Sequence, residues 1–325
     1  MNLLKIIKTN FLQSAYRKLL RNKILEDISF CFTADFKQYL LRADAVTKIA
    51  SLKAGLDSIS ISHIDAFVNR MLNFPSANYS GMIVGTLDKI IASENLGYNE
   101  GEIAEHIHNV SKKRYKISQY PVETFYFYHG LKFLDSGTLS RLADGDFLDC
   151  GAYIGDSALA LLQYKPKKIY SFEVSKRFLG EYQNTMSQNG VSPMQAEVFH
   201  CGTGLENKSI TFSETNSAGN NISTPGNDKV DITTIDSFVE KYTLKPSLLK
   251  MDVEGEELNT ILGAANTLRK FKPVISVAIY HNPSQFFELK TLIDSWGIGY
   301  QFIIRSLRPR VIPMEMTLIA YQSRS

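Results

Sequence analysis

The most informative stretch of the sequence is Phe147-Leu148-Asp149-Cys150-Gly151-Ala152-Tyr153-Ile154-Gly155-Asp156, in which an apolar run meets two glycines. The apolar run predicts a buried β-strand. Gly151 and Gly155 permit positive φ and a close approach of a ligand to the backbone, as in turns that open a helix and bind a cofactor. Their spacing differs from the GxGxxG of dinucleotide enzymes, which disfavours a pyrophosphate site. Taken alone, the two glycines fit a purely structural turn equally well.

A second apolar run, Lys168-Ile169-Tyr170-Ser171-Phe172-Glu173, ends in an acid about twenty residues after the glycine turn. In a doubly wound sheet, a carboxylate at this place can accept hydrogen bonds from both hydroxyls of a ribose. Such a contact is common to NAD enzymes and to enzymes that use S-adenosylmethionine (SAM). The glycine spacing favours the second class.

A third run, Leu248-Leu249-Lys250-Met251-Asp252-Val253-Glu254-Gly255-Glu256-Glu257, delivers Asp252 and Glu254 to the carboxyl end of a predicted strand. Open α/β sheets bind their ligands at this end. Glu256 and Glu257 are also explained by the positive N-terminus of the following helix. That explanation fits Asp252 less well.

The chain after Gly145 alternates between short apolar runs and helical segments, which predicts an α/β fold with a largely parallel sheet. Strands are expected at 147–151, 168–174, 197–201, 248–253, 274–280, 300–304 and 317–320, and helices at 156–162, 177–188, 256–268 and 285–294. The segment 209–231 is rich in Asn, Ser and Gly, and we expect a hairpin and loop over the sheet edge, a candidate lid or substrate contact.

The N-terminal part of the chain has a mostly helical pattern. Residues 3–20 predict a basic amphipathic helix, which either lies on an anionic membrane surface or packs on this protein or another subunit. His106 and His108 have the alternate spacing of one strand face, but without further ligands nearby they are interpreted as surface or core histidines rather than a metal site.

Composition narrows the class of protein. The chain has 325 residues and 44% hydrophobic content, enough for two domains, and its formal charge of +3 is too small to predict a nucleic-acid partner. The three cysteines, without a CxxC pair, suit free thiols in a reducing compartment. With no transmembrane run or signal peptide apparent, we expect a cytoplasmic protein, with peripheral contact at the inner membrane face as an open alternative.

Together, these blocks resemble the FkbM family of SAM-dependent methyltransferases. The resemblance covers roughly residues 120–321 and includes the glycine turn, the run that ends in Glu173 and the run from Leu248 to Glu257. It also includes, in the family's order, Thr234-Ile235-Asp236-Ser237-Phe238, Gly263-Ala264, Lys272-Pro273 and Tyr280-His281-Asn282. The family's turn usually has Asn where this chain has Tyr153.

The resemblance implies a Rossmann-like, seven-stranded class I methyltransferase sheet over residues 120–325, with an antiparallel last strand. Residues 1–119 then form a helical region for oligomerisation or acceptor placement. The implied cofactor is SAM, and the expected cofactor-binding residues are Asp149, Gly151, Ala152, Tyr153, Gly155, Glu173 and Asp252. The implied reaction is O-methylation of a hydroxyl, with a saccharide or a glycolipid or polysaccharide intermediate as the expected acceptor.

Methyl transfer needs an aligned acceptor oxygen and a group that removes its proton. Asp252, Glu254 and His281 are expected to converge at the strand ends, and His281 is the favoured base because an unperturbed histidine titrates near neutrality. In the less favoured alternative, these three residues and Asn282 bind a divalent metal.

The acceptor and partners stay open at this point. Arg305, Arg308 and Arg310 are candidates to hold a phosphorylated acceptor. Alternatives are another small-molecule or protein acceptor, and a non-catalytic scaffold with the SAM fold. A homo-oligomer is also possible.

Overall fold

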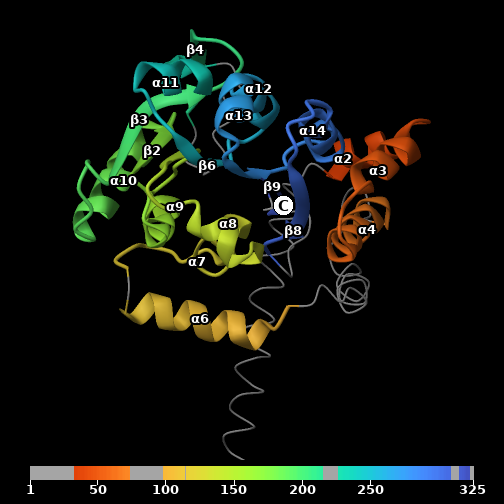
Figure 1. The fold of residues 1–325 in the computed structure, drawn as a ribbon, viewed down its shortest axis with the longest axis horizontal. Coiled ribbons are helices and arrows are strands. Elements are labelled where there is room, and N and C mark those ends of the chain that lie inside the picture. The colour runs from red at the N-terminus through yellow and green to blue at the C-terminus, as the bar shows by residue number, and fades with distance from the viewer. Residues whose placement is uncertain (1–32, 74–97, 114, 215–225, 309–314, 323–325) are drawn as a thin grey trace, which may run out of the picture.

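The computed structural model describes residues 33–73, 98–113, 115–214, 226–308 and 315–322. Helices cover a large, mostly parallel sheet. The helices of residues 33–73 lie beside a helix at 283–295 and a strand at 301–306, near the end of the chain (Figure 1). The architecture is therefore the α/β class that the sequence predicts.

The sheet has nine strands in the order β4-β5-β3-β2-β1-β6-β7-β9-β8. The strands are β1 (Asp146–Cys150), β2 (Lys168–Glu173), β3 (Ala196–Thr203), β4 (Lys208–Phe212), β5 (Asp228–Thr233), β6 (Pro246–Met251), β7 (Val274–Ala278), β8 (Gln301–Ser306) and β9 (Met316–Tyr321). Strands β4 and β9 run antiparallel to their neighbours.

The expected number of seven strands is wrong. All seven expected strands are present, including the antiparallel last strand β9, but β4 and β5 extend the sheet by two. These two strands come from the segment expected to be a hairpin and loop over the edge, and the hairpin is confirmed, since β4 and β5 pair antiparallel with Ile210 opposite Val230. The hairpin joins the sheet, because β5 also pairs in parallel with β3, with Cys201 opposite Asp231.

The central strands are buried on both faces, which explains their continuous apolar runs. In β1 and β6, Phe147 and Leu248 belong to the hydrophobic cluster on one face, whereas the adjacent Leu148 and Leu249 belong to the cluster on the other. This alternation follows from the two-residue period of a strand.

The helices that follow the strands are α9 (Asp156–Leu161), α10 (Lys176–Gln188), α11 (Ile235–Lys241), α12 (Glu257–Leu262), α13 (Ala265–Phe271) and α14 (Pro283–Ser295). The single helix expected over 256–268 is wrong, because α12 ends at Leu262, directly before Gly263, and α13 begins at Ala265. A Cβ at Gly263 would lie 2.0 Å from the carbonyl oxygen of Gly204. The break therefore lets two backbones approach where only glycine fits.

Helices α2 (Thr33–Leu40), α3 (Ala45–Lys53) and α4 (Ser58–Asn73) pack on α14 and β8. Phe36 and Phe67 are fully buried in the cluster that also contains side chains of the central strands. The Phe67 ring stacks on Phe286 of α14, with centroids 4.0 Å apart. The division between residues 1–119 and 120–325 stays a prediction, but these helices share a core with the sheet.

Between these helices and β1, the chain forms α6 (Glu100–Lys113), α7 (Val122–Phe125), the 3₁₀ segment η1 (Tyr128–Phe133) and α8 (Ser136–Ser140), and a second 3₁₀ segment, η2 (Leu162–Tyr164), follows α9. The strand geometry considered for His106 and His108 is wrong, because both lie on α6. His106 Nε2 is 2.9 Å from the carbonyl oxygen of Phe125, so this imidazole helps to attach α6 to the segment before η1.

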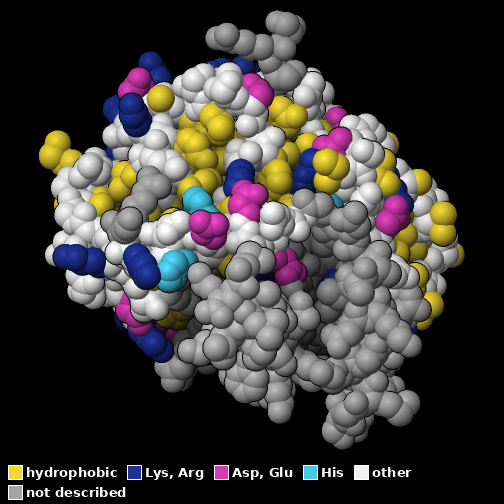
Figure 2. All heavy atoms as spheres, turned by 90° about the horizontal axis from the view of Figure 1, so that it is seen from below, with side chains coloured by type: hydrophobic (Ala, Val, Ile, Leu, Met, Phe, Trp, Pro, Cys, Tyr) yellow, Lys and Arg dark blue, Asp and Glu magenta, His cyan; other side chains and the backbone are white. Residues whose placement is uncertain are grey.

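The predicted basic amphipathic helix at residues 3–20 lies outside the described residues. Within the described part of the chain, no helix combines the length and apolar character needed to cross a membrane. On the face shown in Figure 2, acidic and basic side chains are interspersed with hydrophobic ones, without a large described patch of one charge.

Candidate functional site

The glycine turn between β1 and α9 has the backbone geometry that its sequence predicts. Gly151 and Gly155 have φ of 81° and 86°, and Tyr153 between them also has a positive φ, 47°. A Cβ at Gly151 would lie 1.8 Å from the Asp252 carbonyl oxygen, whereas one at Gly155 would meet Met186 and Tyr182 of α10. Gly151 thus permits contact with the end of β6, and Gly155 permits packing on α10.

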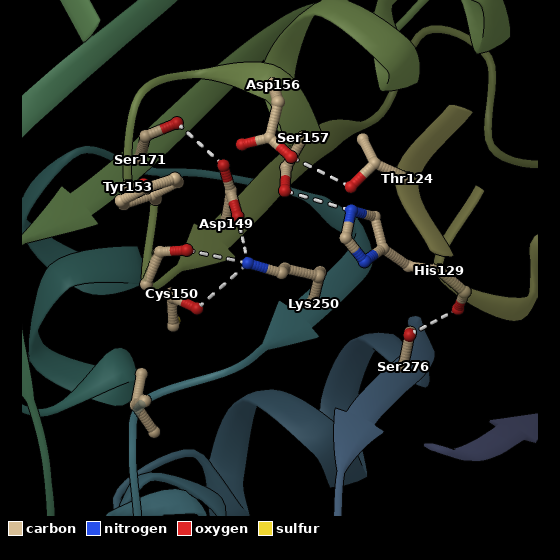
Figure 3. A network of polar contacts seen from close by, with 12 residues as sticks. Thr124, His129, Asp149, Cys150, Tyr153, Asp156, Ser157, Ser171, Lys250 and Ser276 are labelled. Atoms are coloured by element: carbon tan, nitrogen blue, oxygen red, sulfur yellow. Dashed lines mark hydrogen bonds and ion pairs between the residues drawn. The ribbon is translucent and has the colours of Figure 1, made fainter. Parts of the chain in front are cut away.

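A buried ion pair beneath the turn, which sequence reasoning missed, joins β1 to β6. Lys250 Nζ lies 3.0 Å from Asp149 Oδ1 and donates a hydrogen bond of 2.7 Å to the carbonyl oxygen of Gly151 (Figure 3). Burial, the largest single cause, lowers the pKa of Lys250, but the carboxylates of Asp149, Asp252 and Asp156 together outweigh it and raise the pKa above its usual value. The ammonium therefore stays charged and holds the turn.

Glu173, at the end of β2, faces the same turn. Its Oε2 accepts a hydrogen bond of 2.8 Å from the backbone N–H of Tyr153, and its Oε1 accepts one of 2.8 Å from Ser175. Burial raises the pKa of Glu173, although these backbone donors oppose the shift. The carboxylate is thus held in place from both sides, and each oxygen retains further capacity to accept hydrogen bonds.

An open cavity of about 290 Å³ lies above the carboxyl ends of the strands. Five of the predicted site residues line it, namely Gly151, Tyr153, Glu173, Asp252 and Glu254. The other predicted residues are placed behind this lining. Asp149 and Ala152 are fully buried, and His281 is 4% exposed.

Asp252, Glu254 and His281 converge as predicted. His281 Nε2 lies 3.4 Å from both Asp252 Oδ1 and Glu254 Oε2, and one ligand atom from each of the three residues lies within 4.8 Å of the others. Glu254 has a positive φ of 54°, which turns the chain so that both acids reach the cavity. In the described part of the chain, this is the one such group with metal-ligand geometry.

Glu257, which the sequence suggested only as a helix N-terminal acid, holds the other side of His281. Its Oε1 is 2.7 Å from His281 Nδ1, and the carboxylate also accepts hydrogen bonds from the backbone N–H groups of Val253 and Gly255. Glu257 is fully buried. The imidazole therefore has a fixed orientation, with Nε2 towards Asp252 and Glu254.

The premise that favoured His281 as a base, an unperturbed pKa, is wrong. Burial alone would lower the pKa of His281, but Glu257, followed by Asp252 and Glu254, raises it to about 10. Burial raises the pKa of Glu254, although His281 opposes the shift. The imidazole would thus carry a proton near neutral pH, in which form it cannot accept another.

Asn282 is engaged elsewhere. Its side chain caps α14 by accepting a hydrogen bond of 2.9 Å from the backbone N–H of Gln285. The side chain of Asn282 therefore serves the helix start, and its part as a fourth metal ligand stays a prediction.

Further cavity residues come from the segment before β1 and from α9, and sequence reasoning missed them. Thr124 donates a hydrogen bond of 2.8 Å to Asp156, and Ser157 Oγ is 2.9 Å from His129 Nε2 (Figure 3). Burial, the largest cause, raises the pKa of Asp156 to about 6. The partners of these two hydrogen bonds lie 32 and 28 residues apart in the sequence and belong to no common motif, so only the fold brings them together at the cavity.

The arginines expected to hold a phosphate are largely engaged by protein carboxylates. Arg305 is buried and forms hydrogen bonds of 3.2 and 2.8 Å to the two Asp57 oxygens. Arg308 lines the cavity, and its Nε is 3.4 Å from Glu123 Oε2. Arg310 lies outside the described residues. Arg305 therefore serves the attachment of α4 rather than a ligand.

Comparison with solved structures gives matches of different strength. Methyltransferase FkbM from Methylobacillus flagellatus KT has a TM-score of 0.60 at 22% identity, over 88% of this chain and 61% of that one. The chain thus spans less than two thirds of that protein's length. Fibrillarin from Aeropyrum pernix, in complex with natively bound S-adenosyl-L-methionine, has a TM-score of 0.34 at 17% identity, over 59% and 72% of the two chains.

Among curated proteins, no sequence matches this chain significantly. In contrast, residues 149–321 match the family model described as the methyltransferase FkbM domain. The matched segment begins at Asp149 in β1 and ends in β9, so it contains the glycine turn, Glu173 and the group around His281. Because this match spans more than half of the 325 residues, the chain belongs to the FkbM methyltransferase family.

Proposed function

We propose that this protein is a SAM-dependent O-methyltransferase that acts on a hydroxyl of a saccharide or of a glycolipid or polysaccharide intermediate. The observation that carries the proposal is Glu173, whose two oxygens are held by backbone N–H groups at the cavity wall beside the turn. This arrangement suits the two hydroxyls of a ribose, because a carboxylate accepts several hydrogen bonds.

The residues around Glu173 fit SAM. Gly151 lines the cavity, and Lys250 beneath it fixes the turn through the hydrogen bond to the Gly151 carbonyl oxygen. When bound, SAM would supply a methyl group on a sulfonium and leave as S-adenosylhomocysteine, and the hydroxyl proton would pass to a carboxylate of Asp252 or Glu254 or to water. Gly151, Tyr153 and Glu173 would hold the cofactor, and Asp252 and Glu254 would lie towards the acceptor.

The charge of the cavity supports an uncharged, hydroxyl-rich acceptor. Among the described residues, acidic side chains outnumber basic ones in its lining, which contains Glu123, Asp156, Glu173, Asp252, Glu254, Glu256 and Glu315 against the cations Lys250 and Arg308. Carboxylates accept hydrogen bonds from sugar hydroxyls but repel phosphates. Since Arg305 is occupied by Asp57, a phosphorylated acceptor is the less favoured substrate.

The test has two steps, with the purified chain in both. Calorimetry with SAM and with S-adenosylhomocysteine measures cofactor binding. Transfer of labelled methyl from SAM is then compared between neutral oligosaccharides and the corresponding sugar phosphates. We expect binding of both cofactor forms and transfer to the neutral acceptors.

The outcomes separate the alternatives. Absence of SAM binding by the folded protein would contradict the proposal and favour a scaffold. Binding with transfer only to a protein or another small molecule would keep methyl transfer but contradict the acceptor class. Preference for the phosphorylated sugars would contradict the charge argument.

A further inference from the structure

The distances within the group of Asp252, Glu254 and His281 match those between ligands of a single metal ion. His281 Nε2 is 3.4 Å from an oxygen of each acid. Two ligands that each lie about 2.1 Å from an ion, at angles of about 90 to 110°, are about 3.0 to 3.4 Å apart. The two separations from His281 thus fit ligands of one ion, and the third, between Asp252 and Glu254, is within 4.8 Å.

The far side of His281 has the arrangement that supports metal-bound histidines. Such an imidazole usually donates its second N–H to a carboxylate, which fixes the ring orientation. Here Glu257 takes this part at 2.7 Å from Nδ1, and it is itself held by the backbone N–H groups of Val253 and Gly255. Nε2 is therefore directed at Asp252 and Glu254 before any ion binds.

Charge balance also favours a cation. Three carboxylates, Asp252, Glu254 and Glu257, surround one imidazole, so the group keeps a net negative charge even when the imidazole is protonated. Buried charges are normally compensated by partners or by metal ions. A divalent cation would balance this group.

The site is open on the side where an acceptor would bind. The side chains of Asp252 and Glu254 are 30% and 31% exposed and line the cavity, whereas His281 and Glu257 form the buried side. An ion held by three protein ligands keeps free coordination positions, as catalytic metal sites do. Those positions would face the cavity.

We propose that Asp252, Glu254 and His281 bind one divalent cation of the Mg²⁺ or Mn²⁺ class at the edge of the cavity. Two carboxylates suit these hard cations. The ion would bind the acceptor hydroxyl, lower its pKa and so ease loss of the proton before the oxygen is methylated. This catalytic part rests on the proposed function, whereas binding of the ion does not.

The test uses the full chain, treated with EDTA and exchanged into metal-free buffer. Mn²⁺ is titrated in, and the free ion is measured by electron paramagnetic resonance. We expect one Mn²⁺ per chain with a Kd below about 1 mM. Asp252→Asn and His281→Ala should each weaken binding by about tenfold or more, and Glu257→Gln by roughly 10- to 100-fold.

Glu256→Gln is the matched control. Glu256 lies in the same loop and lines the cavity, but its carboxylate accepts a hydrogen bond from Asn259 and is not in the group around His281. It should leave Mn²⁺ binding unchanged. Because Asp252→Asn keeps the side-chain shape, it carries the test if His281→Ala does not fold.

Two results would overturn the proposal: no Mn²⁺ binding by the wild-type chain below about 1 mM, or unchanged binding by folded Asp252→Asn. Calorimetry of SAM binding in EDTA distinguishes failure of the metal proposal from failure of the proposed function, because loss of SAM binding would contradict only the proposed function. With a working acceptor, turnover at the full rate after exhaustive chelation would overturn the role of the ion.

Discussion

Lys250 Nζ lies 3.0 Å from Asp149 Oδ1, and both side chains are buried beneath the cavity. Asp149 also accepts a hydrogen bond of 3.2 Å from Ser171 of β2, and Lys250 donates to the carbonyl oxygen of Gly151. The pair thus connects three adjacent strands to the turn after β1. The pair therefore stabilises the fold, and it also holds the turn that shapes the cofactor site.

Replacing one member of this pair should destabilise the fold strongly. Lys250→Met leaves Asp149 as a buried charge without its cation, a change that typically costs about 3 to 5 kcal/mol. Urea unfolding monitored by circular dichroism measures the loss. Lys168→Met is the control, because Lys168 pairs with Glu197 in a more exposed place and should lose about 1 kcal/mol or less. Equal losses in the two variants would contradict the importance of the buried pair.

Glu173→Ala should weaken SAM binding by about 1.5 to 3 kcal/mol, the usual range for hydrogen bonds to a charged group. The loss arises from the ribose contacts and from release of the Tyr153 N–H that Glu173 holds. Calorimetry at 25 °C measures the affinity. Glu197→Ala, on the neighbouring strand β3 and away from the cavity, is the control. If a folded Glu173→Ala variant binds SAM as the wild type does, the carboxylate is not a ribose ligand.

Substitutions at three glycines with positive φ distinguish the cost of backbone strain from the cost of a steric clash. Gly190→Ala meets no atom within 4 Å, so it carries only the strain of φ 67°, about 1 kcal/mol. Gly151→Ala should cost more and abolish SAM binding, because its Cβ would lie 1.8 Å from Asp252 O. Gly155→Val should also abolish binding, through displacement of α10, while the far-UV spectrum stays near that of the wild type. Retained SAM binding by Gly151→Ala would place the cofactor elsewhere.

The sequence predicts the central part of the fold because its signals are local. Buried strands appear as apolar runs, and the Gly151 turn and Glu173 follow them directly in the chain. Strands β4 and β5, the outer two on one side of the sheet, lack this signal, because most of their side chains are at least partly exposed and polar. Their place in the sheet depends on the pairing of β5 with β3 and of β4 with β5, which no local pattern encodes.

For the site, the sequence predicts which residues converge but not the environment of each side chain. Asp252, Glu254 and His281 are recognisable because they follow neighbouring strands. The environment of each side chain depends on distant partners, and for that reason the sequence does not reveal that Glu257 raises the pKa of His281. The same holds for Arg305, whose partner Asp57 is 248 residues away in the sequence.

The packing of the N-terminal helices can be tested at Phe67. This ring is fully buried and stacks on Phe286, so Phe67→Ala should destabilise the C-terminal part by about 3 to 5 kcal/mol. Tryptophan fluorescence from Trp296, at the end of α14, follows unfolding of that part. Leu72→Ala, at a 43% exposed position of the same helix, is the control. An unchanged Trp296 transition in Phe67→Ala would mean that residues 1–119 are a separable appendage.

The ion pair of Asp57 and Arg305, which attaches α4 to β8, should lose its contribution to stability at acid pH. Burial would raise the pKa of Asp57, but its hydrogen bonds to Arg305, followed by those to Ser60, lower it below its usual value. A carboxyl with a lowered pKa in the folded state contributes stability above its unfolded pKa of about 3.9, and this contribution is lost as the pH falls through the folded value. Because Asp57 is 40% exposed, we expect a contribution of only about 1 kcal/mol.

The measurement is urea unfolding of the wild type and Asp57→Asn between pH 7 and pH 3. Wild type should be the more stable at pH 7, and the two stabilities should approach each other below about pH 4, where the wild-type carboxyl becomes protonated. Asp65→Asn, which removes a carboxylate on the exposed side of α4, should show a smaller difference at pH 7. A difference between wild type and Asp57→Asn that stays constant down to pH 3 would assign the effect to side-chain shape, and the ion pair with Arg305 would then carry no pH-dependent stability.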